Sequence, residues 1–240
     1  MRMPQPAGGA ARIAFFGGTF DPPHLGHLAV ARAARAALEL DQVLFAPVGA
    51  QPLKPHGATA PFADRVAMTR LAIAGEPAFA VSMADAPTAD GSPNYTIETL
   101  ERLRAELPSG ACLCCLMGAD SFLTLRKWHR AAEVPFAAPL IVASRPGQQL
   151  DRLASWLPAG ITIEATPEDD CPQRFKEVHC YRVRNPAGDS APFFLLPGLD
   201  VEISATAIRQ AAAVSADLPA ERAVLPAAVA EYIRQHQLYR

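Results

Sequence analysis

The sequence lacks long hydrophobic runs, has few cysteines and carries no excess of either charge. No apolar stretch approaches the ~20 residues of a membrane-spanning helix, so we expect no membrane partner. Three of the five cysteines, Cys112, Cys114 and Cys115, lie close together, unlike a spaced disulfide framework, which favours a reducing cytoplasm. With 22 basic and 24 acidic residues, the net charge of −2 gives no general attraction to nucleic acid.

The composition is that of a globular protein, because half of the 240 residues are hydrophobic and 19% are charged. We expect a single domain over residues 1–240. Residues 1–12 lack the apolar core of a signal peptide and are interpreted as a loose leader. The pattern weakens over 148–191, which indicates an irregular insertion, and 204–240 is expected to be a C-terminal helical portion.

The most informative stretch is GGTFDPPHLGH, residues 17–27. It follows the apolar run 13–16 and precedes an alanine-rich segment, so strand, glycine-rich turn and helix come in the order that builds phosphate pockets in α/β proteins. The two prolines place the helix start near His24 or Leu25, and the helix is expected to reach Leu38. His24 and His27 then share one face of the first turn, where helix N–H groups favour an anion. This pattern predicts a nucleotide site.

The remaining segments predict an α/β fold, a Rossmann-like, doubly wound parallel sheet with helices on both faces. Strands are expected at 43–48, 79–82, 111–117, 140–143 and 193–197, with 111–117 central and its cysteines acting as small buried hydrophobes. Helices are expected at 62–74, with Arg65 among its polar spacers, and at 97–107, 121–126, from 203 and from 226. The acidic run 168–170 is interpreted as a solvated loop.

The stretch 17–27 resembles the signature of the nucleotidylyltransferase superfamily, whose HxGH element is matched by His24, Gly26 and His27. The segment ISATAIR, residues 203–209, resembles the second signature of that family, which binds the triphosphate. Ser204 is also placed to cap a helix, and Arg209 can form bidentate contacts with phosphate oxygens. Helix capping explains Ser204 but not the combination of Ser204, Thr206 and Arg209 in one segment.

The resemblance implies further contacts with ATP. A basic residue in the loop 51–57 reaches the triphosphate, which here is Lys54 or His56, while a solvated surface lysine is the alternative. Gly118 and Asp120 resemble a Gly-x-Asp element beside ATP, although Asp120 can equally cap the next helix, and Arg145 lies on the nucleotide side. The residues expected to contact ATP are Gly17, Gly18, Thr19, Phe20, His24, His27, Gly118, Asp120, Arg145, Ser204, Thr206 and Arg209.

The resemblance also implies an acceptor site. Tyr95 and Thr96 lie beside the mononucleotide in the family, and Trp128 stacks on its pyridine ring. Helix capping by Asn94 or Thr96, and an ordinary core role for Trp128, are the structural alternatives.

The length, these residues and the C-terminal pattern are closest to the bacterial nicotinate-nucleotide adenylyltransferases. This resemblance implies that ATP and nicotinate mononucleotide give deamido-NAD and pyrophosphate, with His24, His27, Lys54 and Arg209 as catalytic residues. Mg²⁺ is expected on the phosphates, without a protein metal site. Another acceptor, such as nicotinamide mononucleotide or phosphopantetheine, and a non-catalytic nucleotide-binding regulator remain alternatives, and the sequence does not decide whether the chain forms a homo-oligomer.

Overall fold

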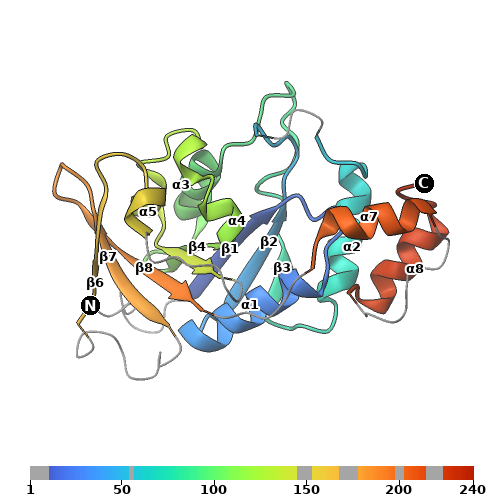
Figure 1. Ribbon diagram of the computed structural model, residues 1–240, viewed down its shortest axis with the longest axis horizontal. Helices are drawn as coiled ribbons and strands as arrows, with labels where there is room; N and C mark the ends of the chain where they lie inside the picture. The colour runs from blue at the N-terminus through green and yellow to red at the C-terminus, as the bar shows by residue number, and fades with distance from the viewer. Residues whose placement is uncertain (1–10, 54–56, 145–152, 168–177, 198–202, 215–223) are drawn as a thin grey trace. The chain divides into compact units, whose positions relative to one another are not determined.

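The computed structural model describes residues 11–53, 57–144, 153–167, 178–197, 203–214 and 224–240 (Figure 1). The predictions for Lys54, His56, Arg145 and the run 168–170 therefore lie outside the described residues. The chain divides into two compact units. The first unit comprises residues 1–16, 30–43 and 95–200, and the second comprises 17–29, 44–94 and 201–240.

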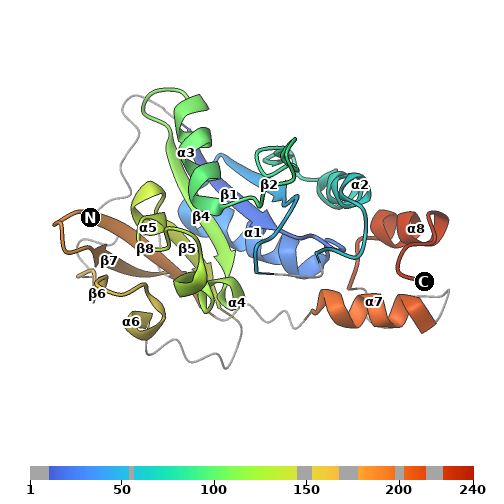
Figure 2. The ribbon, with the colours of Figure 1, turned by 90° about the horizontal axis from the view of Figure 1, so that it is seen from above.

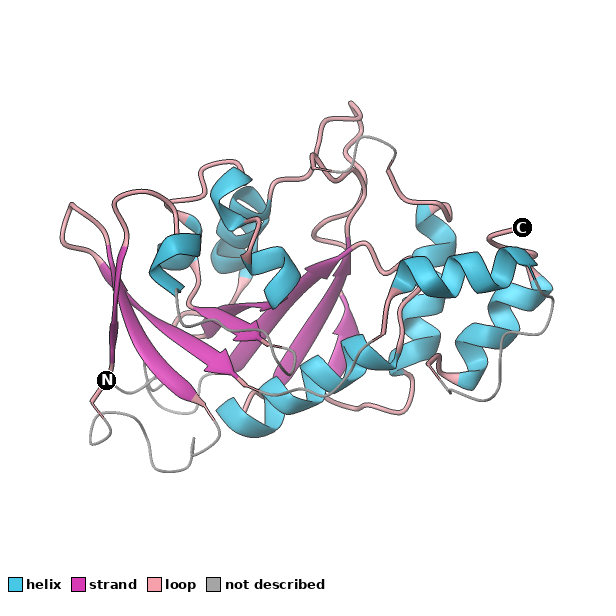
Figure 3. Ribbon diagram, in the orientation of Figure 1, coloured by secondary structure: helices cyan, strands magenta, loops and turns pink. Residues whose placement is uncertain are grey.

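The described strands form one sheet of eight, in the order β3-β2-β1-β4-β5-β8-β7-β6 (Figure 3). Their bounds are β1 Arg12–Gly18, β2 Gln42–Pro47, β3 Phe79–Val81, β4 Cys112–Gly118, β5 Leu140–Ala143, β6 Thr162–Ala165, β7 His179–Arg184 and β8 Ser190–Leu196. β4 pairs in parallel with β1 and β5, and β5 pairs in parallel with β8. The six residues of β4 that precede Gly118 are buried. The predicted α/β, Rossmann-like fold and the central position of this strand are confirmed.

Part of the interval 148–191 is regular. β6 and β7 are antiparallel, and β7 pairs antiparallel with β8, so these strands extend the parallel sheet within the first unit. A short helix, α6 (Leu153–Trp156), precedes them.

The helices expected from residues 25, 62, 97, 203 and 226 are present in that order, whereas the short helix at 134–137 was not expected. Their bounds are α1 Leu25–Leu38, α2 Phe62–Ile73, α3 Thr96–Glu106, α4 Ala119–Phe122, the 3₁₀ helix η1 Leu125–Lys127, α5 Val134–Ala137, α7 Ala205–Val214 and α8 Ala227–Gln235. Both predicted ends of α1 are confirmed. In the second unit α2 and α8 lie side by side in both views (Figures 1 and 2), and α8 buries Val229 and Ile233 at helical spacing. No helix among the described residues is long and apolar enough to cross a bilayer.

Three local predictions are wrong. The helix predicted at 121–126 is two short pieces, α4 and η1, so Asp120 lies in the first turn of α4 and Gly118, not Asp120, is its N-cap. The N-cap of α3 is Tyr95, without a side-chain cap bond, so neither Asn94 nor Thr96 caps that helix. Asn94 instead uses its side chain to join two loops, because its Oδ1 accepts from the Ala50 N–H and its Nδ2 donates to the Ala86 carbonyl, both at 2.9 Å.

The cysteines fall into two kinds. Cys112, Cys114 and Cys115 are buried free thiols of β4, as predicted for small hydrophobes. A hydrogen bond with Cys112 and burial together raise the pKa of the Cys114 thiol. Cys180 is disulfide-bonded, which departs from the expected chain without a disulfide framework.

Candidate functional site

The buried carboxylate of Asp21 anchors the glycine-rich loop of the second unit. Asp21 is only 5% exposed. Oδ2 accepts from the Thr59 N–H at 2.7 Å, and Oδ1 accepts from the Ala60 N–H at 3.0 Å and from the Tyr239 hydroxyl at 2.8 Å. A carboxylate that accepts three hydrogen bonds is stabilised in its buried position. The loop is therefore fixed both to the residues before α2 and to the penultimate residue of the chain.

Arg65 of α2 supports the same loop through hydrogen bonds to backbone carbonyls. The residue is 2% exposed, and its Nη1 donates to the Thr19 carbonyl at 2.7 Å while its Nε donates to the Ala60 carbonyl at 3.2 Å. Burial lowers the pKa of Arg65, and the negative charge of Asp21 opposes that shift. A buried guanidinium is tolerated because backbone oxygens and a nearby carboxylate compensate its lost hydration.

The two predicted histidines are stacked at the start of α1. Their ring centroids lie 3.7 Å apart with 29° between the planes, and His24 is 8% exposed. The His24 backbone N–H donates to Nδ1 of His27 at 3.2 Å. Because Nδ1 accepts this bond, a neutral His27 carries its proton on Nε2, which makes Nε2 a hydrogen-bond donor. His27 thus has the tautomer that can donate a hydrogen bond to a phosphate oxygen.

Phe20 explains one of the two glycines. Its residue is 1% exposed, has a left-handed φ of 48°, and its ring meets His27 edge-on with centroids 4.9 Å apart. A β-carbon added to Gly18 would lie 3.0 Å from Cζ of Phe20, so a side chain at this position would require the ring to shift by a few tenths of an ångström. The Phe20 side chain is therefore a support for His27, and any contact of this residue with ATP would involve its backbone.

The second predicted phosphate-binding segment meets this loop within the second unit. Arg209 of α7 donates through Nη1 to the Asp21 carbonyl at 2.7 Å and through Nη2 to Oγ1 of Thr206 at 3.2 Å. Oγ of Ser204 accepts from the Ala207 N–H at 3.5 Å, which confirms the predicted cap. Asp21 is three positions before His24, so two motifs separated by 188 residues converge on one loop.

The end of β2 completes the surroundings of the loop. Oγ1 of Thr19 donates to Oε1 of Gln51 at 2.9 Å, and the Val48 N–H donates to the Gly18 carbonyl at 2.9 Å. A β-carbon on Gly49 would lie 2.5 Å from the Pro87 nitrogen, so the chain needs glycine at this close approach.

The predicted mononucleotide residues lie in the first unit, considered by itself. Tyr95 and Thr96 are at the start of α3, and the Tyr95 ring lies 4.3 Å from that of His129, between centroids. Trp128 is half-buried, and its Nε1 donates to Oγ1 of Thr124 at 3.2 Å. Because His129 directly follows Trp128 in the sequence, the start of α3 contacts the segment that carries Trp128.

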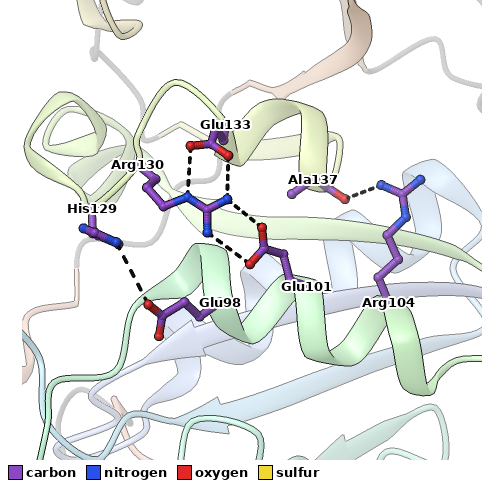
Figure 4. A network of polar contacts seen from close by, with 7 residues as sticks. All are labelled: Glu98, Glu101, Arg104, His129, Arg130, Glu133 and Ala137. Atoms are coloured by element: carbon purple, nitrogen blue, oxygen red, sulfur yellow. Dashed lines mark hydrogen bonds and ion pairs between the residues drawn. The ribbon is translucent and has the colours of Figure 1, made fainter.

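A network of ion pairs holds the segment that follows Trp128 (Figure 4). Arg130, at a left-handed φ of 49°, forms bidentate pairs with Glu101 of α3, at 2.8 and 3.1 Å, and with Glu133, at 2.5 and 2.9 Å. The hydrogen bonds that Arg130 donates to Glu133 and Glu101 raise the pKa of Arg130. His129 Nε2 lies 4.0 Å from a carboxylate oxygen of Glu98. These contacts fix the turn that carries Trp128 onto α3.

Sequence reasoning missed the supporting residues of the site. The sequence indicates no role at the loop for Arg65 or Tyr239, and it presents Asp21 only as part of the motif. The charged Arg65 at a position of α2 that is 2% exposed is a signal that only the structure reveals.

The chain resembles known proteins over nearly its whole length. A family model described as "Cytidylyltransferase-like" matches residues 15–211. A protein of Aeromonas salmonicida named "Probable nicotinate-nucleotide adenylyltransferase" is 40% identical over 236 residues, covering 96% of this chain and 98% of that protein. A protein of Solibacter usitatus with the same name is 35% identical over 228 residues, covering 95% and 99%.

A solved structure supports the fold. The structure titled "Plasmodium falciparum nicotinic acid mononucleotide adenylyltransferase complexed with NaAD" aligns with a TM-score of 0.68 over 95% of this chain and 97% of that chain. The sequence identity is 13%, so this likeness concerns the fold alone.

Proposed function

The chain belongs to the cytidylyltransferase-like family of nucleotidyltransferases, and on that premise we propose how it transfers the adenylyl group of ATP to nicotinate mononucleotide. The products are deamido-NAD and pyrophosphate, a step in NAD synthesis. The observation that carries the proposal is the 2.7 Å hydrogen bond from Arg209 Nη1 to the Asp21 carbonyl, because it joins the α7 segment to the loop of the HxGH helix.

The reaction exchanges one P–O bond for another. A phosphate oxygen of the mononucleotide bonds to the α-phosphorus of ATP, and the bond from that phosphorus to the oxygen bridging to the β-phosphorus breaks. The bridging oxygen leaves with pyrophosphate. Because the attacking phosphate is already an anionic nucleophile, the protein needs no nucleophilic side chain and supplies positioning and charge stabilisation.

The described residues of the second unit take the polyphosphate in this proposal. Nε2–H of His27 donates to an α- or β-phosphate oxygen, with His24 beside it, while Gly17 and Gly18 let the backbone approach. Ser204, Thr206 and Arg209 surround the triphosphate tail, and Lys54 remains a proposed contact there. Gly118, Asp120 and Arg145 are proposed for the adenosine side of ATP.

Mg²⁺ is proposed to enter with ATP. When bound, it neutralises part of the charge on the phosphate oxygens. Among the described residues no group of three or more His, Cys, Asp or Glu is placed to hold a metal. The Asp21 carboxylate already accepts from two backbone N–H groups and a phenol. We propose that the ion is held mainly by phosphate oxygens and water.

The cell compartment is a further proposal. We propose the cytoplasm, because three of the described thiols are free. The disulfide at Cys180 is the opposing observation.

A comparison of acceptors tests the function. Pyrophosphate release with Mg-ATP would be measured side by side for nicotinate mononucleotide, nicotinamide mononucleotide and phosphopantetheine. We expect the acid mononucleotide to react fastest. A faster reaction with either other acceptor would assign a different transferase activity, and ATP binding without release for any of the three would favour a regulator.

Replacing Trp128 by alanine tests the acceptor site. Removing a ring that stacks on the pyridine is expected to raise the KM for nicotinate mononucleotide by at least about threefold, since stacking contributes roughly 0.5–1.5 kcal/mol beyond area burial. The KM for ATP should not change. Steady-state kinetics checks both values, with Trp156→Ala as the control because Trp156 of α6 is the other tryptophan of the chain and is 37% exposed. An unchanged mononucleotide KM in Trp128→Ala would assign this ring a core role.

A further inference from the structure

The penultimate residue of the chain reaches the phosphate loop. Tyr239 is 9% exposed, and its hydroxyl donates to Oδ1 of Asp21 at 2.8 Å across 218 positions of sequence. Burial and the neighbouring Asp21 charge raise the pKa of the Tyr239 phenol, so it stays a neutral donor at physiological pH. We propose that Tyr239 is a positioning residue for adenylyl transfer, which acts through Asp21 on the loop carrying His24 and His27. This inference rests on the proposed function.

The backbone of Tyr239 indicates that the placement of its phenol is specific. The residue has a φ of 67°, in the left-handed region that a bulky aromatic residue rarely adopts. Such a conformation persists only where surrounding contacts stabilise it, and the described contact of the hydroxyl is with Asp21.

Asp21 connects this phenol to the proposed phosphate ligands. Its carboxylate holds Tyr239, while its backbone carbonyl accepts from Arg209 Nη1 at 2.7 Å. The C-terminal segment also meets the other end of the loop, because the Leu25 N–H donates to the Val224 carbonyl at 2.9 Å. A displacement of Asp21 would therefore move both the start of α1 and the guanidinium of Arg209.

The attachment of α8 does not depend on Tyr239. A separate hydrogen bond joins α8 to α2, because the Tyr232 hydroxyl donates to Oδ1 of Asp64 at 2.8 Å. Val229 and Ile233 are buried at 0% and 3% exposure. The Tyr239 side chain is thus directed at the phosphate loop, whereas the Tyr232 side chain is directed at α2.

This pair of tyrosines provides a matched test in the full chain. Tyr239→Phe keeps the ring and removes the donor, and kcat is expected to fall about tenfold with the mononucleotide KM unchanged. Tyr232→Phe loses a bond of equal length outside the loop, and its kcat is expected to stay near that of the unchanged protein. Steady-state kinetics and thermal melting of both variants are compared. Equal kcat values for the two variants would overturn the proposal.

The same substitution in a His27→Ala protein distinguishes a positioning role of Tyr239 from a general loss of stability. If Tyr239 acts through the histidine loop, Tyr239→Phe should lower kcat much less in a His27→Ala protein than in the unchanged one. A full tenfold loss in both backgrounds would overturn the proposal. If Tyr239→Phe does not fold, Asp21→Asn tests the same link from its other end, and unchanged kcat there would also reject it. Absence of transfer by the unchanged protein would instead reject the proposed function.

Discussion

Replacing His27 by alanine is expected to lower kcat by about 100- to 1,000-fold, the loss typical of removing one donor to a developing anionic charge. The reason is geometric. His27 Nδ1 accepts the His24 N–H at 3.2 Å, so Nε2 carries the donor hydrogen toward a ligand phosphate. Phe20 holds the ring from its edge, so the imidazole is placed before ATP binds.

Pyrophosphate release under saturating Mg-ATP and nicotinate mononucleotide measures this effect. His236→Ala is the control, since His236 follows α8, is exposed and stacks on Tyr232 with ring centroids 4.0 Å apart, outside the phosphate loop. Thermal melting of both variants checks that the fold is retained. Near-normal turnover by His27→Ala would reject a catalytic role for this residue.

Arg209→Lys is expected to lower kcat/KM for ATP by about 10- to 100-fold, the equivalent of charge-assisted hydrogen bonds of roughly 1.5–3 kcal/mol. The guanidinium donates to the Asp21 carbonyl and to Oγ1 of Thr206 with two different nitrogens. Its planar fork can do this while a further N–H meets a phosphate oxygen, whereas a lysine ammonium has three donors on one atom.

The matched control is Arg234→Lys. Arg234 is paired with Glu231 on the exposed side of α8, so the same chemical change should leave kcat/KM for ATP within about twofold, as for other exposed pairs. If Arg209→Lys and Arg234→Lys had the same kinetics, α7 would not bind the polyphosphate.

Much of the fold was predictable because its signals are local. The two prolines and the alanine-rich run that follows them give both ends of α1, and the apolar run 140–143 gives β5 without error. The HxGH segment predicts a nucleotide site from its own residues, whereas the triphosphate role of ISATAIR follows from its resemblance to the family signature. The periodicity of apolar residues and the positions of prolines can be recognised without knowledge of the tertiary structure.

The contacts that support the loop were not predictable, because the residues that form them are distant from one another in sequence. The helical spacing predicts Arg65 as a polar residue between apolar ones, yet the fold buries it to 2% exposure, where it donates to the Thr19 carbonyl. Asparagine is a residue type that often caps helices. The Asn94 side chain instead accepts a hydrogen bond from the Ala50 N–H, and this contact overrides the capping preference. Nothing local connects Asp21 with a tyrosine 218 positions later.

We propose above all that two imidazoles and one guanidinium bind the same polyphosphate. Side-chain ¹H–¹⁵N NMR of the full chain, titrated with a non-hydrolysable Mg-ATP analogue and no mononucleotide, tests it most directly. We expect the imidazole signals of His24 and His27 and the guanidinium signal of Arg209 to shift together, with one midpoint. Imidazole signals that move while the Arg209 signal stays at its starting position would contradict it.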